Sequence, residues 1–181
     1  MSANTALLVI DVQNFFFHEM RPIYIGEEVV SKIKALISKA RVSGVPVIYI
    51  QHLVGDKSGI QIDGTPLGAI HQAIAPTEND LVICKTTPDS FLGTNLDEVL
   101  KEMGIKKLIV TGFQTEFCVD TTCRRAFSLG YQVVLAGDAH STYDNPVLSA
   151  EQIRLQLAYI YSFNPDWFAE VVRSENILDS M

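Results

Sequence analysis

The sequence predicts an α/β fold in which a parallel sheet lies between two layers of helices. Two observations carry this prediction. Short runs of apolar, mostly branched residues alternate along the chain with longer segments whose apolar residues recur at helical spacing. Polar residues follow the short runs, as they do at the carboxyl ends of buried parallel strands. Alternating strands and helices are joined by right-handed crossovers, which place helices on both faces of the sheet.

The expected strands are the short apolar runs. Residues 6–10 are continuously apolar, which is typical of a central strand buried on both faces. The run ends on Asp11, and three consecutive phenylalanines at residues 15–17 follow in an expected loop. Further strands are expected at residues 45–50, 81–84, 107–111, 131–135 and 167–172.

The expected helices alternate with these strands. Residues 26–41 carry their apolar side chains on a single helical face, and Gly44 ends this helix. Polar N-caps and terminal glycines mark the others. Further helices are expected at residues 95–103 after Thr94, at residues 119–129 before Gly130, and at residues 150–161 after Ser149.

A long segment at residues 53–79 interrupts this alternation. It is rich in Gly, Asp, Pro and Thr, and we expect a loop with one helical turn near residues 69–73. Long irregular loops in compact domains are usually functional or mobile. A lid over the carboxyl edge of the sheet and a contact between subunits are both open interpretations.

The composition is that of one globular domain, which we expect to span residues 1–181. Hydrophobic residues make up 48% and charged residues 19% of the chain, which is enough for a sizeable core. The net charge of -7 and the absence of a basic block argue against a nucleic-acid partner. The apolar run at residues 6–10 is too short for a signal peptide or a membrane span. Three cysteines without metal-like spacing favour reduced thiols and a cytoplasmic location.

Cys118 lies where a predicted strand, residues 107–111, turns into a predicted helix, residues 119–129. A thiol in this position is exposed at the carboxyl end of the strand and faces the positive end of the helix dipole. That setting lowers the pKa of a thiol and favours a nucleophile. The alternative is a small buried apolar residue, which is what most free cysteines are. The cysteine alone leaves both interpretations open.

Polar side chains gather directly after the predicted strands. Because the carboxyl ends of parallel strands share one edge of a sheet, we expect these side chains at a common rim. Three of them, an acid, a lysine and the cysteine, carry the strongest chemistry and converge if their strands are neighbours. The lysine also has a simpler interpretation, a charge that reaches solvent along its flexible stem. The rim is expected to hold Asp11, Gln51, His52, Lys85, residues 114–118 and Asp138.

These residue types together support acyl transfer. Asp11 can accept the thiol proton of Cys118 and return it to a leaving amine. Lys85 can keep Asp11 ionised and help to stabilise the thiolate. Attack on a carbonyl produces an oxyanion, for which backbone amides at the start of the helix are available donors. The reaction class that follows is hydrolysis of an amide or related C–N bond through a thioester.

The same segments resemble the isochorismatase-like cysteine hydrolases. The resemblance rests on Asp-Val-Gln-Asn at residues 11–14, on Lys85, and on Gly-Phe-Gln-Thr-Glu-Phe-Cys-Val-Asp-Thr-Thr-Cys-Arg at residues 112–124. It extends over residues 6–171, nearly the whole chain. It implies a three-layer, Rossmann-like α/β/α fold with a six-stranded parallel sheet.

The resemblance also implies roles for individual residues. Asp11 is implied as the base, Lys85 as its partner and Cys118 as the nucleophile. A cis peptide bond between Phe113 and Gln114 is implied as well. It would direct the Gln114 amide, together with the Cys118 amide, into an oxyanion hole.

The chain departs from the best-known branch of this family in its histidines. Nicotinamidases carry an Asp-x-His pair and a later His that bind a metal near the pyridine nitrogen. This chain has Gln51-His52-Leu53 at that place, and the lone His71 further on is a poor metal site. We therefore expect no cofactor, no catalytic metal and no activity on nicotinamide. For His52, a substrate contact, support of the site and a purely structural role all remain open.

Aromatic residues near the expected site suggest an apolar, partly aromatic pocket. The candidates for substrate contacts are Phe15, Phe16, Phe113, Phe117 and Tyr143, together with the polar side chains of Gln13 and His52.

The function that we expect is cleavage of a C–N bond in a small amide, lactam, imide or carbamoyl compound. One alternative is hydrolysis of a vinyl ether, as in the branch of the family that acts on isochorismate. A second is a redox-active thiol protein, which needs a low thiol pKa, and a third is a binding or scaffold protein. The expected partner is a small-molecule substrate, with no membrane contact. Apolar late segments and the resemblance together favour a homodimer or homotetramer.

Overall fold

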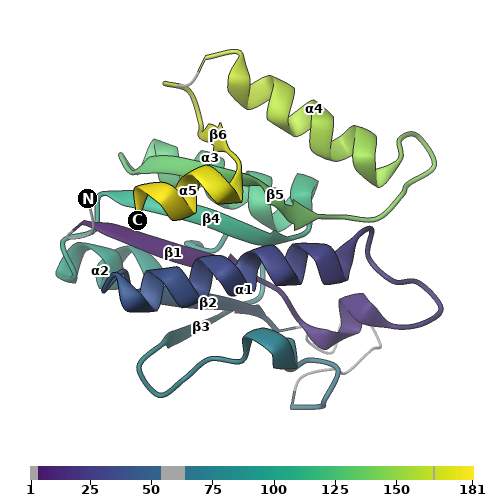
Figure 1. Ribbon diagram of the computed structural model, residues 1–181, viewed down its shortest axis with the longest axis horizontal. Coiled ribbons are helices and arrows are strands. Elements are labelled where there is room, and N and C mark those ends of the chain that lie inside the picture. Colours follow the sequence, from purple (N-terminus) through teal and green to yellow (C-terminus); the bar gives the residue numbers. More distant parts are fainter. Residues whose placement is uncertain (1–3, 54–63, 165) are drawn as a thin grey trace.

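The protein is described by a computed structural model that defines residues 4–53, 64–164 and 166–181 (Figure 1). Within these ranges six strands form one parallel sheet in the order β3-β2-β1-β4-β5-β6. The predicted α/β fold with a six-stranded parallel sheet is confirmed. The strands are β1 (Thr5–Ile10), β2 (Val47–His52), β3 (Leu81–Lys85), β4 (Lys107–Phe113), β5 (Gln132–Ser141) and β6 (Glu170–Val172).

Helices cover both faces of the sheet (Figure 1). One apolar cluster joins the sheet to α1 (Gly26–Val42) and α5 (Ser174–Ser180). A second cluster joins its other face to α2 (Leu96–Glu102), α3 (Asp120–Ser128) and α4 (Ala150–Ser162). The side chains of β1 alternate between the two clusters, and all six are buried. This is why its sequence is apolar at consecutive positions rather than at alternate ones.

The order of the strands reverses beside β1. The chain proceeds from β1 to β2 and β3 on one side, and from β4 to β5 and β6 on the other. In open α/β sheets, ligands bind at the carboxyl ends of the strands at such a switch point. Asp11 directly follows β1, and the Cys118 segment directly follows β4, so both lie at this position.

The fifth strand is longer than predicted. It continues to Ser141, with a shift in its pairing to β4 between Val110 and Gly112. Asp138 consequently lies inside the strand, where its carboxylate accepts hydrogen bonds from the backbone N–H and the hydroxyl of Ser174, at 2.7 and 2.9 Å. The prediction that Asp138 belongs to the polar rim is wrong, because this acid is bound to the start of α5.

Two further differences lie in β3 and at the C-terminal end. β3 is an edge strand in which Cys84 is exposed and Leu81 and Val82 are more than 40% exposed, unlike the strands in the middle of the sheet. Residues 167–172 contain a shorter strand, β6, and the sequence pattern did not predict α5. Cys123 is buried.

The described part of the long loop lies against the carboxyl edge of the sheet. Residues 64–70 pair with the segment after β1 through hydrogen bonds from the Asn14 and Phe15 amides to the Ala69 and Leu67 carbonyls. A short helical turn follows at Gln72–Ile74, close to the predicted position. The rest of the loop, residues 54–63, lies outside the described residues. No helix within the described ranges is both long and apolar enough to cross a membrane.

Candidate active site

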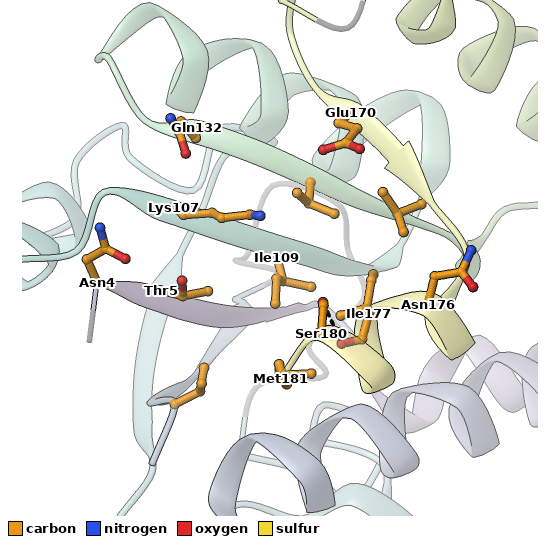
Figure 2. A pocket seen from close by; sticks show the side chains of 13 residues that line it. Asn4, Thr5, Lys107, Ile109, Gln132, Glu170, Asn176, Ile177, Ser180 and Met181 are labelled. Carbon is orange, nitrogen blue, oxygen red and sulfur yellow. Dashed lines mark hydrogen bonds between the residues drawn. The ribbon is translucent and has the colours of Figure 1, made fainter. Parts of the chain in front are cut away.

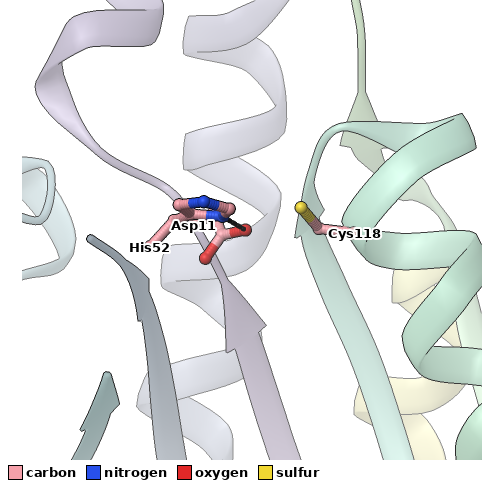
Figure 3. A group of neighbouring side chains, drawn as sticks. All are labelled: Asp11, His52 and Cys118. Atoms are coloured by element: carbon pink, nitrogen blue, oxygen red, sulfur yellow. Dashed lines mark ion pairs between the residues drawn. The ribbon is translucent and has the colours of Figure 1, made fainter. Parts of the chain in front are cut away.

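The structure brings the three chemically strongest residues together at the carboxyl edge of the sheet. The Lys85 Nζ lies 2.7 Å from the Asp11 Oδ2, an ion pair between two almost fully buried side chains. One ligand atom each from Asp11, His52 and Cys118 lies within 4.8 Å of the others. Figure 3 shows the Cys118 sulfur directed from the β4 side toward the Asp11 carboxylate and the His52 ring. The expected convergence of these residues is therefore present.

Asp11 occupies an unusual backbone conformation at the end of β1. Its φ is 51°, in the left-handed region, which aspartate tolerates better than most residues. Its backbone N–H still donates to the Ile50 carbonyl, which keeps this turn attached to β2. Among the described residues, neither carboxylate oxygen accepts a hydrogen bond of good geometry. The buried carboxylate thus has a balancing cation and free acceptor capacity for a proton.

Gly112 lets β4 approach the end of β1. Its φ is 120°, and a Cβ at this position would lie 2.0 Å from the backbone oxygen of Ile10. No other residue type fits without moving one of the two strands. The close approach places the segment that carries Cys118 beside Asp11.

The segment that follows β4 is wound as a π-helical turn over Thr115–Val119 before α3 begins. Such turns within helices occur frequently at functional sites. The peptide bond between Phe113 and Gln114 is cis, as the family resemblance implies. The Gln114 carbonyl accepts from the amides of Phe117 and Val119, which fixes the start of this turn.

The surroundings of Cys118 correct one expectation. Burial, and then the negative charge of Asp11, raise the pKa of the thiol to about 12, and the nearby Lys85 only partly opposes them. The predicted lowering of this pKa by the helix start is wrong, because Cys118 is only 9% exposed and desolvation dominates. At neutral pH the resting group is a thiol, so its attack on a carbonyl requires a base.

His52 lies beside both Asp11 and the Lys85 ammonium. The Lys85 Nζ lies 3.2 Å from the His52 Nδ1 and 3.0 Å from the Thr87 carbonyl, in addition to its contact with Asp11. An ammonium only donates, so Nδ1 accepts and the ring proton lies on Nε2. Of the three roles left open for His52, this contact favours support of the Asp11–Lys85 pair.

The Gln13 side chain joins His52 to the loop after β2 by hydrogen bonds. Its amide donates to the carbonyls of His52 and Gly68 at 3.1 and 2.7 Å, and its oxygen accepts from the His52 backbone N–H at 2.9 Å. The side chain has no exposed surface. Its expected role as a substrate contact is therefore wrong for this arrangement, in which it joins the ends of β1 and β2 to the loop.

The predicted aromatic contacts divide into two groups. Phe16 and Phe113 are core residues, 5% and 0% exposed, whose rings pack edge to face. They do not present a surface to a ligand, which corrects the expectation for both. Phe15 is partly buried and Phe117 is 51% exposed, so these two remain available. Tyr143 is partly buried and donates to the Phe16 carbonyl.

A contact that the sequence interpretation missed connects β5 to the Cys118 segment. His140 is fully buried, and its Nδ1 lies 2.9 Å from the hydroxyl oxygen of Thr115, the first residue of the π-helical turn. Burial lowers the pKa of His140 to about 3, so the ring is neutral at pH 7. The strand expected from the sequence ends at residue 135, which leaves the inward position of His140 in β5 undetected.

A separate cleft of about 750 Å³ lies at the opposite edge of the sheet, at the amino ends of the strands (Figure 2). None of the predicted site residues lines it. Lys107 and Glu170 extend over an apolar floor that includes Ile109 and Ile177. Its position places it away from the Asp11, Lys85 and Cys118 side chains.

The chain is similar to known proteins over most of its length. The family model described as the isochorismatase domain matches residues 5–162. Streptothricin hydrolase from Streptomyces noursei is 36% identical over 141 residues, which are 78% of this chain but only 51% of that protein. The chain thus spans about half the length of this relative. Nicotinamidase 3 from Arabidopsis thaliana is 31% identical over 174 residues, which are 89% of this chain and 85% of that one.

Solved structures give the same result. The crystal structure of an isochorismatase from Pseudomonas putida superposes with a TM-score of 0.88 at 32% identity, covering 96% of this chain and 90% of that one. The family model, the relatives and the shared fold cover nearly all of the described sheet. This chain belongs to the isochorismatase family of hydrolases.

Proposed function

We propose that this protein is a cysteine hydrolase that cleaves the C–N bond of a small amide, lactam, imide or carbamoyl compound through a thioester on Cys118. The observation that carries the proposal is the buried Asp11 carboxylate, which is paired with Lys85 and lies within 4.8 Å of the Cys118 sulfur. This is the arrangement of a nucleophile with a base that a third group holds in place.

In the first half of the proposed reaction, Cys118 becomes acylated. As the sulfur attacks the carbonyl carbon and the C–S bond forms, the thiol proton moves to Asp11. The resulting oxyanion is stabilised by the backbone amides of Gln114 and Cys118. Protonated Asp11 then gives its proton to the departing nitrogen. The C–N bond breaks, leaving an amine and a thioester.

In the second half, water replaces the sulfur. Asp11 takes a proton from water as the oxygen attacks the thioester carbonyl, and the C–S bond breaks. The carboxylic acid leaves, and the proton on Asp11 returns to the Cys118 sulfur. Lys85 compensates the Asp11 charge whenever that group is ionised, and His52 and the Thr87 carbonyl hold the ammonium in position.

The raised pKa of Cys118 supports this assignment over a redox-active thiol, which depends on a stable thiolate. The name of Nicotinamidase 3 supports amide chemistry among the relatives. Nicotinamide itself is not proposed as the substrate, because Gln51-His52-Leu53 lacks the acid and the paired histidine of the nicotinamidase metal site. We place the protein in the cytoplasm on the basis of its three free cysteines.

Turnover of a panel of small amides, lactams, imides and carbamoyl compounds tests the proposal. We expect Cys118→Ser to lower kcat/KM by at least about 10³-fold and Asp11→Asn by about 10²–10⁴-fold. Cys84→Ser is the matched control, because this thiol is exposed on the edge strand β3, and it should retain full activity. Loss of turnover upon treatment with a chelator would contradict the expected independence from metals. Turnover that survives Cys118→Ser would contradict the proposed nucleophile.

A further inference from the structure

We propose that Asp11, His52 and Cys118 also form a three-ligand site for a thiophilic divalent cation of the Zn²⁺ class, and that occupation of this site inhibits the enzyme. Metal binding itself requires no turnover, and only the inhibition by the bound metal rests on the proposed function. The three side chains offer a carboxylate oxygen from the residue after β1, an imidazole nitrogen from the end of β2, and a sulfur from the π-helical turn after β4 (Figure 3).

The spacing of the donor atoms suits a tetrahedral ion. From ordinary zinc–ligand bond lengths, the ligand atoms of such a site lie about 3.3–3.6 Å apart. The Asp11 Oδ2 and the His52 Nδ1 are 3.8 Å apart, and all three donors lie within 4.8 Å of one another. Side-chain movements of about 1 Å bring them to bonding distance, without a change in the sheet.

The chemistry of the donors selects the ion. The lone pair of the His52 Nδ1 faces the site, because this nitrogen accepts from Lys85. Sulfur and imidazole suit Zn²⁺ and Co²⁺, whereas Mg²⁺ and Ca²⁺ require oxygen ligands. The His52 side chain is 24% exposed, so solvent reaches the group and can supply a water as fourth ligand.

Lys85 competes with the cation for the same space. Its ammonium lies 2.7 Å from the Asp11 oxygen and 3.2 Å from the His52 nitrogen, two of the three proposed ligand atoms. A divalent ion must displace it or bind against its charge. We infer that Lys85 weakens metal binding at this site as well as compensating Asp11. On binding, a metal–sulfur bond replaces the S–H bond of Cys118, the proton passes to solvent, and no oxidant is involved.

Cobalt titration tests the site directly. Co²⁺ bound to a thiolate produces a ligand-to-metal charge-transfer band, which reports the metal–sulfur bond whether or not the enzyme turns over substrate. We expect this band in the wild-type protein and its loss in Cys118→Ser. His52→Gln should weaken Co²⁺ binding about tenfold or more. Cys84→Ser should leave the band unchanged, because Cys84 lies outside the cluster.

Removal of Lys85 supplies the most distinctive result. We expect Lys85→Gln, checked for folding by circular dichroism, to bind Co²⁺ more tightly than the wild type by about tenfold or more, although its turnover falls. Zn²⁺ should inhibit wild-type turnover reversibly, with full recovery after a chelator.

A charge-transfer band that persists in Cys118→Ser, or its absence from both the wild type and folded Lys85→Gln, would overturn the site. If cobalt binds as expected but no amide is turned over, the proposed function fails and the site stands. If an amide is turned over but neither protein shows the cobalt band, the metal site fails and the proposed function stands.

Discussion

Cys118 combines a suppressed ionisation with a neighbouring base. Burial and the Asp11 charge hold its pKa near 12, so the proposed attack depends on transfer of the proton to Asp11 rather than on a preformed thiolate. The same residue has a consequence for stability. The pKa is higher in the folded state than in the unfolded chain, so the folded state binds more protons at alkaline pH.

We expect this stabilisation to be complete below about pH 9 and to be lost as the pH rises toward 12. In urea unfolding between pH 7 and 11, the free energy of unfolding should fall less steeply for Cys118→Ala than for the wild type. The difference should approach about 1.4 kcal/mol per pH unit at the alkaline end. Cys84→Ala should retain the wild-type slope, since its thiol is exposed. Equal slopes for all three proteins would mean that the Cys118 pKa is not raised.

At the scale of the element, the contact between β4 and β1 positions the site. Gly112→Ala would place a Cβ 2.0 Å from the Ile10 oxygen and would also retain a left-handed φ. We expect a loss of about 3 kcal/mol or more in the free energy of unfolding, together with a loss of turnover. Gly93→Ala is the matched control, because its φ of 71° is also positive but no atom lies within 4 Å of the added Cβ. It should cost only about 1 kcal/mol, and equal losses would contradict the close approach of the strands.

The contact between β5 and the π-helical turn depends on a neutral histidine. The His140 pKa of about 3 is below that of an unfolded histidine near 6.5. The unfolded chain therefore binds more protons between these values, and stability is lost as the pH falls from about 6.5 toward 3. We expect His140→Gln to flatten the acid side of the stability profile by up to about 1.4 kcal/mol per pH unit. His71→Gln is the control, and a difference from the wild type no larger than that of the control would contradict a buried neutral His140.

At the scale of the whole molecule, α4 and the segment after it present a second apolar surface. Its inner residues are buried, whereas Leu155, Tyr159 and Phe163 are 64%, 68% and 72% exposed at intervals of one helical turn. We propose that a second copy of this chain covers this surface. In size-exclusion chromatography with light scattering, the wild type should elute as a dimer or tetramer and Leu155→Lys/Tyr159→Lys as a smaller species. Met20→Lys, on another exposed side chain, should not change the mass; a monomeric wild type would contradict the proposal.

Hydrophobic patterning predicted the sheet because β1 and the interior of β4 are buried on both faces. This patterning failed where backbone pairing or a hydrogen bond between distant residues, rather than the burial of apolar side chains, determines a strand or helix. β5 passes through Gly137 and the polar residues after it, which have no strand pattern of their own, although His140 and Ser141 pair with Gly112 and Phe113 of β4. α5 is short and has few apolar residues, so its position depends on the contact of Ser174 with Asp138.

Only part of the candidate site could be predicted from the sequence. Asp11, Lys85 and Cys118 could be found from their places after strands, since parallel topology brings strand ends together. The roles of Gln13 and His140 could not, because both depend on hydrogen bonds between segments far apart in the sequence. The direction of the Cys118 pKa shift was also inaccessible, because it depends on burial that only the packed structure defines.

The central claim, a thioester on Cys118, is tested most directly by mass spectrometry of protein quenched in acid during turnover of an amide substrate. We predict an added mass equal to the acyl group of the substrate on the peptide that contains Cys118. Cys118→Ser should lack this thioester, and Cys84→Ser should retain it. Turnover with no acyl adduct on Cys118 at any quench time, or an adduct confined to another residue, would contradict the account.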